Sequence, residues 1–491
     1  MTTPTPPIDL AGTGQRLRPA AAVAAALIAE LAAICPTDDG EAITAEASRD
    51  WWPLALHWAL AGQVPVRAGV VCRPQTVDHV RAVVLACAAH GTPITPAGGR
   101  SGVSGGSVPL HGGVVLDLTA LAGIVRVDAT SGVVEALAGT FGPDLAATLA
   151  GQHGLTVGHL PQSFDLATVG GWAACRGAGQ YSTRYGKIED IVIGLEVVLA
   201  DGSVVRTGGA PAAATGPDLT QLFIGSEGTL GVITSVTMRA HPLPATQATA
   251  AYSLPSFSAG IEACRRILRR GATPAVLRLY DGAETQRNFS GDGTWCALVV
   301  LDEGDQAIVG AAMAVVAEEC AGFQALGAAP VERWLQHRND ATALGVLTRK
   351  GFVVDTLEVA APWSRLDQVV ETTTAALLAC RHARLASCHL SHSYLDGACL
   401  YFTFAATPPP EAIDATYVAL WDAGQRAALA AGANLSHHHG VGINRGRFMA
   451  EHLGAGLAVL QRVKDALDPQ GIMNPGKLGL ASSIDEGTLW P

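Results

Sequence analysis

Three glycine-rich segments within residues 95–234 constrain the fold of this chain more than any other feature. The first, TPAGGRSGVSGGS at residues 95–107, directly follows a predicted strand. Its glycines let the backbone adopt positive φ and turn successive N–H groups into one concavity, which suits a phosphate. An ordinary glycine-rich loop has the same composition, so this segment alone leaves both interpretations open. It does not match G-x-G-x-x-G before a helix, which disfavours a nicotinamide-binding Rossmann site.

The two later segments favour the phosphate interpretation. LPQSFDLATVGGWAACRGAGQYSTRYGKIEDIVIGLEVVLADG (residues 160–202) has a Gly-Gly turn and small residues, and it ends in a strand with an Asp-Gly turn. FIGSEGTLGVIT (residues 223–234) again places glycine and a hydroxyl side chain before a strand. Three such turns predict an extended dinucleotide between two subdomains, with its pyrophosphate held by backbone N–H groups.

The length and composition predict an enzyme of at least two domains. The chain has 491 residues, 49% of them apolar and 15% charged, with a net charge of −11. This excludes a disordered or fibrous chain, and the lack of a long basic run argues against nucleic acid as a partner. The ten cysteines are scattered without a C-x-x-C pair. That pattern disfavours a zinc ribbon or a redox dithiol and is typical of a reducing compartment, so we expect a cytoplasmic protein.

The pattern along the chain predicts an α+β fold in four parts. Residues 1–65 are expected to be helical, and residues 16–35 form an alanine-rich helix better than a signal peptide because Glu30 interrupts the apolar run. Residues 66–243 alternate strands with helices, for example a strand in 66–74, a helix in 76–91 and a strand in 92–99. Residues 244–430 form an α+β cap, and residues 431–491 carry a loop and a last helix at 450–468.

The segment NLSHHHGVG, residues 434–442, is the most unusual polar feature. If it is extended, His437 and His439 lie on one side and His438 on the other. Zinc ligands are usually spaced differently, with a further pair elsewhere, so the triplet is not expected to bind metal. A polar surface loop and one wall of an active site remain as alternatives.

The three glycine-rich segments, in this order and spacing, resemble the FAD-binding domain of the vanillyl-alcohol oxidase / p-cresol methylhydroxylase family, and GSEGTLGVIT is among its most specific stretches. The resemblance implies a two-subdomain FAD-binding domain with a cap. Arg100 lies where some relatives have a flavin-linking histidine, so we expect non-covalent FAD. The implied cofactor contacts are Pro96, Ala97, Gly98, Gly99, Arg100, Ser101, Gly102, Val103, Ser104, Pro161, Gln162, Ser163, Thr168, Gly170, Gly171, Arg176, Gly177, Gly179, Gly225, Ser226, Glu227, Gly228, Thr229, Gly231 and Ile233.

Beyond residue 244 the chain resembles the alkyldihydroxyacetonephosphate synthase branch of this family. PAVLRLYDG (residues 274–282) places Arg278 on a flavin-facing arginine, and CHLSHSYLDGACLYFTFA (388–405) places Tyr401 on a catalytic tyrosine. NLSHHHGVG matches that branch's triple histidine at His437, His438 and His439. The resemblance implies replacement of the acyl group of acyl-dihydroxyacetone phosphate by a long-chain alcohol, through an adduct at flavin N5. The candidate substrate contacts are His159, Arg338 and Tyr394.

Several residues depart from that branch and keep other functions open. GHLPQS (residues 158–163) has Gln162 at an acidic position, and Arg338 and Arg349 only flank the place of a substrate-binding arginine. The first alternative is an FAD-linked oxidase or dehydrogenase of a 2-hydroxy acid. Its metal-binding relatives carry G-H-x-G-D-G-N-x-H and E-H-G, but here Tyr401 and His438 replace two of those ligands, so no metal is expected. The second is a flavin-binding protein without catalysis.

The expected partner is a small-molecule or lipid substrate. A lipid would allow peripheral contact with a membrane, although no strongly basic amphipathic helix stands out to anchor one. A homodimer is expected from the resemblance alone.

Overall fold

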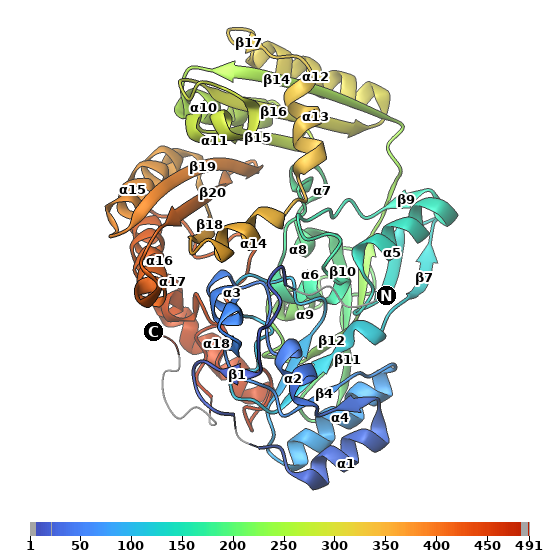
Figure 1. The fold of residues 1–491 in the computed structure, drawn as a ribbon. Coiled ribbons are helices and arrows are strands. Elements are labelled where there is room, and N and C mark those ends of the chain that lie inside the picture. The colour runs from blue at the N-terminus through green and yellow to red at the C-terminus, as the bar shows by residue number, and fades with distance from the viewer. Residues whose placement is uncertain (1–5, 21, 483–489, 491) are drawn as a thin grey trace.

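The computed structural model describes residues 6–20, 22–482 and 490, and within them the strands form three sheets of four or more strands (Figure 1). Two of these sheets and their helices occupy the lower right of Figure 1, and the third lies above them. This mixed arrangement of helices and sheets confirms the predicted α+β class.

The first sheet has four strands in the order β2-β4-β6-β5, and β4, β6 and β5 are parallel. Its strands are β2 (Thr37–Asp38), β4 (Val70–Cys72), β5 (Ile94–Ala97) and β6 (Val114–Asp117). Helices α1 (Ala25–Ile34) and α4 (Val77–Ala89) pack on it. The side chains of β4 and β6 are all buried, as expected for a parallel sheet. These elements confirm the strand–helix–strand pattern predicted for residues 66–99.

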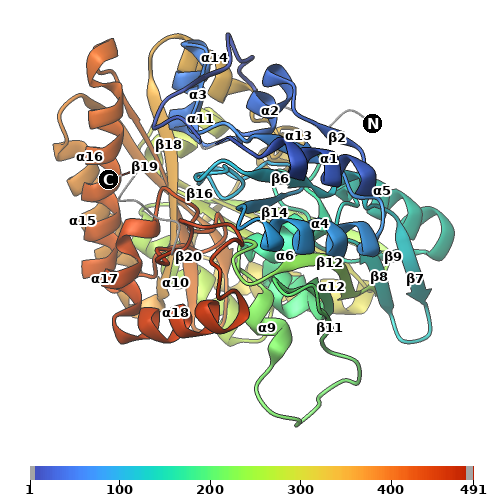
Figure 2. The same cartoon turned by 90° about the horizontal axis from the view of Figure 1, so that it is seen from below.

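The second sheet is antiparallel, with the order β11-β10-β12-β8-β7. Its strands are β7 (Ile124–Asp128), β8 (Val133–Leu137), β10 (Val192–Val198), β11 (Val204–Arg206) and β12 (Val232–Arg239). The associated helices are α5 (Gly142–Thr148), a π-helix (Leu149–His153), α6 (Val169–Cys175), α7 (Ser182–Tyr185), α8 (Ile188–Ile191) and α9 (Leu219–Phe223). The exposed residues 207–218, between β11 and α9, project away from the rest of the molecule in Figure 2.

The third sheet, which forms the cap, has seven strands in the order β17-β14-β16-β15-β19-β20-β18. They are β14 (Thr246–Leu254), β15 (Val276–Tyr280), β16 (Cys296–Gly304), β17 (Gln324–Ala325), β18 (Val353–Pro362), β19 (Ala383–Ser393) and β20 (Gly397–Ala406). Leu277 and Leu279 of β15 lie in the large core formed with the helices of one face. Those helices are α10 (Phe257–Arg269), α12 (Gln306–Glu319), α15 (Leu366–Ala379) and α16 (Ile413–Ala430).

The opposite face of the cap sheet is turned toward the half of the molecule that holds the first two sheets. Val276 and Tyr280 of β15 pack there against Tyr181 and against Trp334 of α13 (Ala329–His337). Because successive side chains of a strand alternate between its faces, Arg278 belongs to this same face. The other helices of the cap region are α11 (Gly282–Phe289) and α14 (Thr342–Arg349), with 3-10 turns at Trp363–Arg365 and Pro410–Ala412.

The two ends of the described chain differ in detail from the sequence prediction. The helix expected over residues 16–35 begins only at Ala25, because the N–H groups of Arg16 and Leu17 bond to Val64 and Pro65 instead. The helix expected at 450–468 is two helices, α17 (Met449–Leu453) and α18 (Ala455–Leu467), since Gly454 has a φ of 53°. The remaining elements are β1 (Gly14–Gln15), α2 (Glu41–Ala47), α3 (Pro53–Leu60), β3 (Gln63–Val64), β9 (Leu155–Thr156), β13 (His241–Pro242) and 3-10 turns at Leu118–Ala120 and Gly446–Phe448.

None of the helices within the described residues has the length and apolar character needed to cross a bilayer.

Candidate active site

The three glycine-rich segments meet at one place in the fold. A Cβ on Gly98 would collide with the Thr168 side chain, which joins the first segment to the second. One on Gly228 would lie 3.0 Å from Pro96 Cγ, which joins the third segment to the first. The backbone N–H of Gly225 donates to Ala173 O at 2.9 Å, which joins the third segment to the second. Only backbones without side chains can approach this closely, which explains the glycines.

Each of the three segments contains one residue other than glycine in the left-handed region. These residues are Arg100, Arg176 and Glu227, with φ values of 53°, 58° and 49°. Such residues are uncommon and cluster at binding sites, where the surrounding structure holds them in place. The N–H groups of Arg176 and Glu227 bond to the carbonyls of Ala173 and Ala174, and the bond from Glu227 fixes the third segment to the second.

Buried polar atoms around these turns support a dinucleotide as the ligand. Within the described residues, Arg100 Nε and Nη1 and Ser226 Oγ form no hydrogen bond, although Arg100 Nη1 lies 3.6 Å from Asp117 Oδ2. Both side chains are at least nine-tenths buried. Buried donors normally have partners, so a cation and a hydroxyl beside left-handed turns fit a phosphate-bearing ligand such as FAD.

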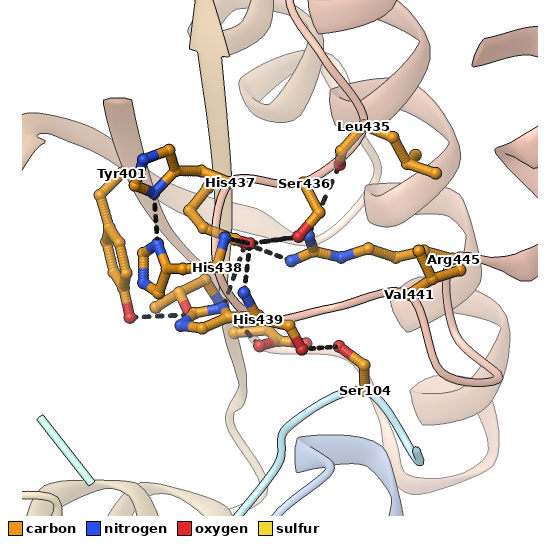
Figure 3. Close-up of polar contacts among 12 residues, drawn as sticks. Ser104, Tyr401, Leu435, Ser436, His437, His438, His439, Val441 and Arg445 are labelled. Atoms are coloured by element: carbon orange, nitrogen blue, oxygen red, sulfur yellow. Dashed lines mark hydrogen bonds and ion pairs between the residues drawn. The ribbon is translucent and has the colours of Figure 1, made fainter. Parts of the chain in front are cut away.

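The histidine turn, residues 434–442, rests directly on these glycine-rich segments. Glu227 accepts hydrogen bonds from the N–H groups of Val441, at 2.6 Å, and Gly442, at 2.8 Å. Ser104 Oγ donates to the carbonyl of His439 at 3.4 Å (Figure 3), and Cys175 Sγ donates to that of His438. The turn therefore borders the predicted cofactor site instead of lying on the surface.

Four strands of the cap sheet place a row of polar residues opposite this turn. Tyr280 of β15 pairs with His389 of β19, His389 pairs with Tyr401 of β20, and Tyr401 pairs with Glu358 of β18. Directly opposite residues point to the same face. The ring of His389 stacks between those of Tyr280 and Tyr401, with centroid distances of 5.1 and 4.8 Å. Tyr401 also donates from its hydroxyl to Thr356 Oγ1 at 3.1 Å.

Glu358 holds the histidine turn in its shape. It is fully buried and accepts hydrogen bonds from both terminal nitrogens of the buried Arg445, from Ser436 Oγ and from the N–H groups of His438 and His439. Burial would raise the pKa of Glu358, but the charge of Arg445 outweighs it and holds the pKa well below its usual range. The carboxylate is therefore ionised, as these donors require.

Because of this clamp the histidine segment is not extended, so the ring arrangement expected for an extended segment does not apply. The backbone bends around the carboxylate, because Glu358 draws the successive N–H groups of His438 and His439 toward one point. His437 and His438 consequently share a side, with their Nδ1 atoms 2.9 Å apart, and His439 Nδ1 lies 3.1 Å from Glu358 Oε2. Sequence periodicity alone could not reveal that a distant carboxylate curls the segment.

A second buried carboxylate, Glu284 of α11, lies behind Arg278. His389 connects the two: its Nδ1 is 2.8 Å from Glu284 Oε2 and its Nε2 is 2.7 Å from Arg278 Nη2. A guanidinium only donates, so Nε2 must be the acceptor and Nδ1–H must donate to Glu284. Burial lowers the pKa of His389, in agreement with a neutral ring. Arg278 Nε donates to Tyr280 OH at 3.1 Å, which fixes the guanidinium further.

Three histidines form a cluster on the other side of Tyr401. His392, at the end of β19, lies with its ring centroid 5.0 Å from that of His437 and 5.2 Å from that of His438. Tyr394 OH contacts His437 Nε2 at 2.8 Å, and Ser182 Oγ contacts His392 Nδ1 at 2.8 Å. This arrangement brings Tyr394, a predicted substrate contact, next to the predicted catalytic histidines.

The other predicted substrate contacts lie at different depths. Arg338 lies over the rings of Tyr181 and Trp334, at 5.3 and 5.7 Å, and Arg278 lies 5.6 Å from the same Trp334 ring. Arg338 is thus close to Arg278, whereas Arg349 bonds to the carbonyl of Pro7. His159 is buried against Trp172, with ring centroids 4.7 Å apart, and its contacts place it beside the second glycine-rich segment.

Sequence reasoning missed Glu284, Glu358, His392 and Arg445. A usable signal existed in the acidic residues of predicted apolar strands, because a charge buried in a sheet needs a partner. That signal would have selected Glu358, in the strand VVDTLEVAAP at residues 353–362, but it would not have identified the partner.

Comparison with known proteins assigns both halves of the chain. Residues 68–208 match the family described as "FAD binding domain", and residues 243–478 match "FAD linked oxidases, C-terminal domain". The uncharacterized FAD-linked oxidoreductase YgcU of Escherichia coli O157:H7 is 33% identical over 435 residues, which cover 84% of this chain and 89% of that protein. The chain belongs to the FAD-linked oxidoreductase family. Its cofactor is FAD.

Other members of this FAD-linked family give the resemblance more detail. Alkyldihydroxyacetonephosphate synthase of Trypanosoma brucei brucei is 29% identical over 461 residues, covering 84% of this chain and 74% of that protein. A solved alkyldihydroxyacetonephosphate synthase superposes with a TM-score of 0.80 at 23% identity, over 96% of this chain and 90% of that one. Solved p-cresol methylhydroxylase superposes with a TM-score of 0.75 at 16% identity, over 93% and 96%. The predicted fold family and cofactor are confirmed. Non-covalent attachment of FAD stays a prediction.

Proposed function

We propose that this FAD-linked protein acts like an alkyldihydroxyacetonephosphate synthase and exchanges the acyl group of acyl-dihydroxyacetone phosphate for a long-chain alcohol. In this exchange the bond from C1 to the acyl oxygen breaks and a bond from C1 to the alcohol oxygen forms. The fatty acid leaves, and the proton of the alcohol is released. FAD, when bound, supplies the reactive ring at which the substrate carbon is held.

The observation that carries the proposal is the convergence of Arg278, Tyr401 and the histidine turn beside the FAD-binding segments. Arg278 comes from β15 and Tyr401 from β20, and the turn follows α16. The turn contacts Ser104 and Glu227, which belong to the first and third glycine-rich segments. These residues were selected from a resemblance to the synthase, and elements far apart in the sequence bring them together.

In the proposed reaction Arg278 supplies a fixed positive charge. Its Nε and Nη2 are held by Tyr280 and His389, and within the described residues Nη1 forms no hydrogen bond. A held guanidinium can therefore direct one nitrogen at charge that develops on the substrate, without first reorganising. Arg338, which contacts the same Trp334 ring, adds a second cation for the phosphate or carboxylate of a substrate.

Tyr401 is suited to deliver a proton. Burial raises the pKa of Tyr401 above its ordinary value, so the phenol keeps its proton at neutral pH. The hydroxyl now donates to Thr356, a weak neutral acceptor, and a charged leaving oxygen would accept the same proton more strongly. The neighbouring neutral rings of His389 and His438 exclude water on both sides of the phenol.

The alternative function is oxidation of a 2-hydroxy acid. The relative with 33% identity carries the name of an FAD-linked oxidoreductase, which favours a net transfer of electrons. Gln162 and the absence of a matching arginine near residues 338–349 point in the same direction, because they change the residues expected to read the phosphate ester. The same Arg278 and Arg338 could hold a carboxylate, so the arrangement of charges serves both reactions.

One experiment separates the two functions. The FAD-loaded protein is incubated with acyl-dihydroxyacetone phosphate and hexadecanol, and ether-linked product is measured by mass spectrometry. In parallel, D-lactate, glycolate and related acids are added anaerobically and the flavin absorbance near 450 nm is followed. Formation of ether product without bleaching supports the transferase. Bleaching by a hydroxy acid without ether product rejects it in favour of the oxidase.

A variant tests the role given to Tyr401 in either reaction. Tyr401→Phe removes the proton and should reduce kcat by about 10²–10⁴-fold. Tyr252→Phe, in a strand of the same sheet but outside the site, is the matched control and should leave kcat unchanged. An unaltered kcat in Tyr401→Phe would remove the phenol from the mechanism. Dimerisation and membrane contact stay separate predictions.

A further inference from the structure

Three imidazoles in the site lie close enough to share one ligand. They belong to His392, at the end of β19, and to His437 and His438 in the histidine turn. One nitrogen from each ring lies within 4.8 Å of those of the other two. Burial lowers the pKa of all three well below the ordinary value, so the rings are neutral at pH 7. Neutral imidazole is the form that binds metal ions.

The outward nitrogens of two of these rings are already held by hydroxyl groups. Ser182 Oγ lies 2.8 Å from His392 Nδ1, and Tyr394 OH lies 2.8 Å from His437 Nε2. The two hydroxyls are themselves 3.2 Å apart. Metal-binding histidines nearly always have such a partner on the second nitrogen, which sets the tautomer and aims the first nitrogen. The inward atoms are then His392 Nε2 and His437 Nδ1.

The inward atoms of the turn form an unusually close pair. His437 Nδ1 and His438 Nδ1 are 2.9 Å apart. When His437 donates from Nε2 to Tyr394, its Nδ1 carries a lone pair, and a second lone pair at this distance would be repelled. Either a proton on His438 Nδ1 or a cation must lie between the two atoms. His392 supplies a third nitrogen on the same side. A proton would be shared by only two nitrogens, whereas a metal ion would use all three.

We propose that His392, His437 and His438 bind one divalent transition-metal ion of the Zn²⁺ class. Three neutral imidazoles are a preferred ligand set for this class, and three protein ligands leave a fourth position open for a water or substrate oxygen. Tetrahedral bonds of about 2.0 Å require nitrogens roughly 3.3 Å apart. The present separations, from 2.9 Å to at most 4.8 Å, bracket this value.

The sequence predicted no metal at the histidine triplet because no further ligand was recognised elsewhere, and His392 of β19 supplies one. The metal-binding pattern considered there contains a glutamate and two histidines of one strand–turn segment, whereas this set has no carboxylate and includes His437. An ion held here would lie beside Tyr401, whose ring stacks on His438 at 5.9 Å. It could polarise a substrate oxygen next to the phenol, which is the Lewis-acid role of an open metal site. The proposal does not depend on which substrate the protein uses.

Direct titration tests the site. FAD-loaded protein without a histidine tag is dialysed against a chelator, freed of it and titrated with ZnSO₄ by isothermal calorimetry. We expect one Zn²⁺ per chain at micromolar affinity or tighter. His392→Gln and His437→Gln should each weaken binding by at least about 100-fold, because each removes one ligand of three. His153→Gln changes an exposed histidine of the π-helix and should bind like the unaltered protein.

Two further measurements keep the test decisive. Tyr394→Phe retains all three ligands and removes one supporting hydroxyl, and it should weaken Zn²⁺ by about 10- to 100-fold. If His392→Gln or His437→Gln loses its flavin or no longer shows a cooperative melting transition, Tyr394→Phe is used in its place. Zinc-edge absorption should show three nitrogen neighbours at about 2.0 Å. The proposal would be overturned if the unaltered protein did not bind Zn²⁺ at 100 µM. It would also be overturned if the His392, His437 and Tyr394 variants bound Zn²⁺ as tightly as the unaltered protein. Because no substrate is used, failure here leaves the proposed reaction untouched.

Discussion

Two buried carboxylates on the cap, Glu284 and Glu358, each hold a histidine and an arginine, but in opposite ways. Glu358 contacts Arg445 directly through both oxygens, so the two charges offset one another. Glu284 reaches Arg278 only through the neutral ring of His389. In the first arrangement the charge of Arg445 is neutralised inside the protein, and the pair holds the shape of a turn. The second orients an arginine without neutralising it, which leaves its charge for a ligand.

The difference predicts that the Glu358 pair acts mainly on stability. Glu358→Gln leaves Arg445 fully buried without a counter-charge, and we expect a loss of about 3–5 kcal/mol in the free energy of unfolding. Guanidinium-chloride unfolding of the FAD-loaded protein measures this loss. The double variant E358Q/R445M removes both charges at similar volume and should be more stable than Glu358→Gln alone.

A double variant as unstable as the sum of its two single variants would show that Glu358 and Arg445 do not act as a pair. Glu371→Gln, at an exposed position of α15, is the matched control and should change stability by less than about 0.5 kcal/mol.

For Arg278 the comparison predicts a loss of activity with little loss of stability. Lysine keeps the charge but cannot donate to Tyr280, His389 and a substrate together. Arg278→Lys should reduce kcat/KM by about 10²–10³-fold while the melting temperature stays within about 2 °C. Arg287→Lys alters a half-exposed arginine of α11 that also pairs with Glu284, and it should keep most of the activity. Equal losses in both variants would mean that the guanidinium of Arg278 has no role beyond that of the other arginine near Glu284.

Glu284→Gln should reduce stability less than Glu358→Gln does and reduce activity less than Arg278→Lys does. The amide oxygen can still accept from His389 Nδ1–H, so the tautomer survives, but a charge-assisted hydrogen bond becomes a neutral one. We expect a loss of about 1–2 kcal/mol in stability and roughly 10-fold in kcat, both smaller than the effects above. Glu284→Ala should cost clearly more activity than Glu284→Gln, since it leaves Nδ1–H unpaired. If the two variants were equally active, Glu284 would not position Arg278.

The parts of the site that were predictable from sequence are those written in one stretch of chain. The glycine-rich turns can be recognised in the sequence because only glycine permits the close approaches at Gly98 and Gly228. Arg278, Tyr401 and the histidines were selected by resemblance to short motifs. In each case the functional residues belong to one short motif, so the motif can be recognised from the sequence alone.

The parts that were missed depend on strand register. Tyr280, His389, Tyr401 and Glu358 form one row only because β15, β19, β20 and β18 pair at particular residues. A shift of one residue would turn Glu358 to the other face, and no local pattern excludes that shift. The shape of the histidine segment depends on the same register, since it is Glu358 that bends the segment. Packing of the whole chain decides which distant residues become partners, such as Glu358 and Arg445, which are 87 positions apart.

His159 is the limiting case of the comparison, because it is a buried imidazole with no carboxylate beside it. Burial, followed by the nearby charge of Lys187, lowers the pKa of His159 to about 3. Its pKa in the unfolded chain is about 6.5, so between these values the unfolded state binds the extra proton. The contribution to stability is therefore complete above pH 6.5 and falls by about 1.4 kcal/mol per unit as the pH drops toward 3.

Unfolding at pH 6.5, 5.5 and 4.5 measures this slope. His159→Phe, which can still stack on Trp172, should flatten the slope by one proton, whereas His153→Phe at an exposed position should not. Identical slopes in all three proteins would mean that the pKa of His159 is not lowered in the folded state.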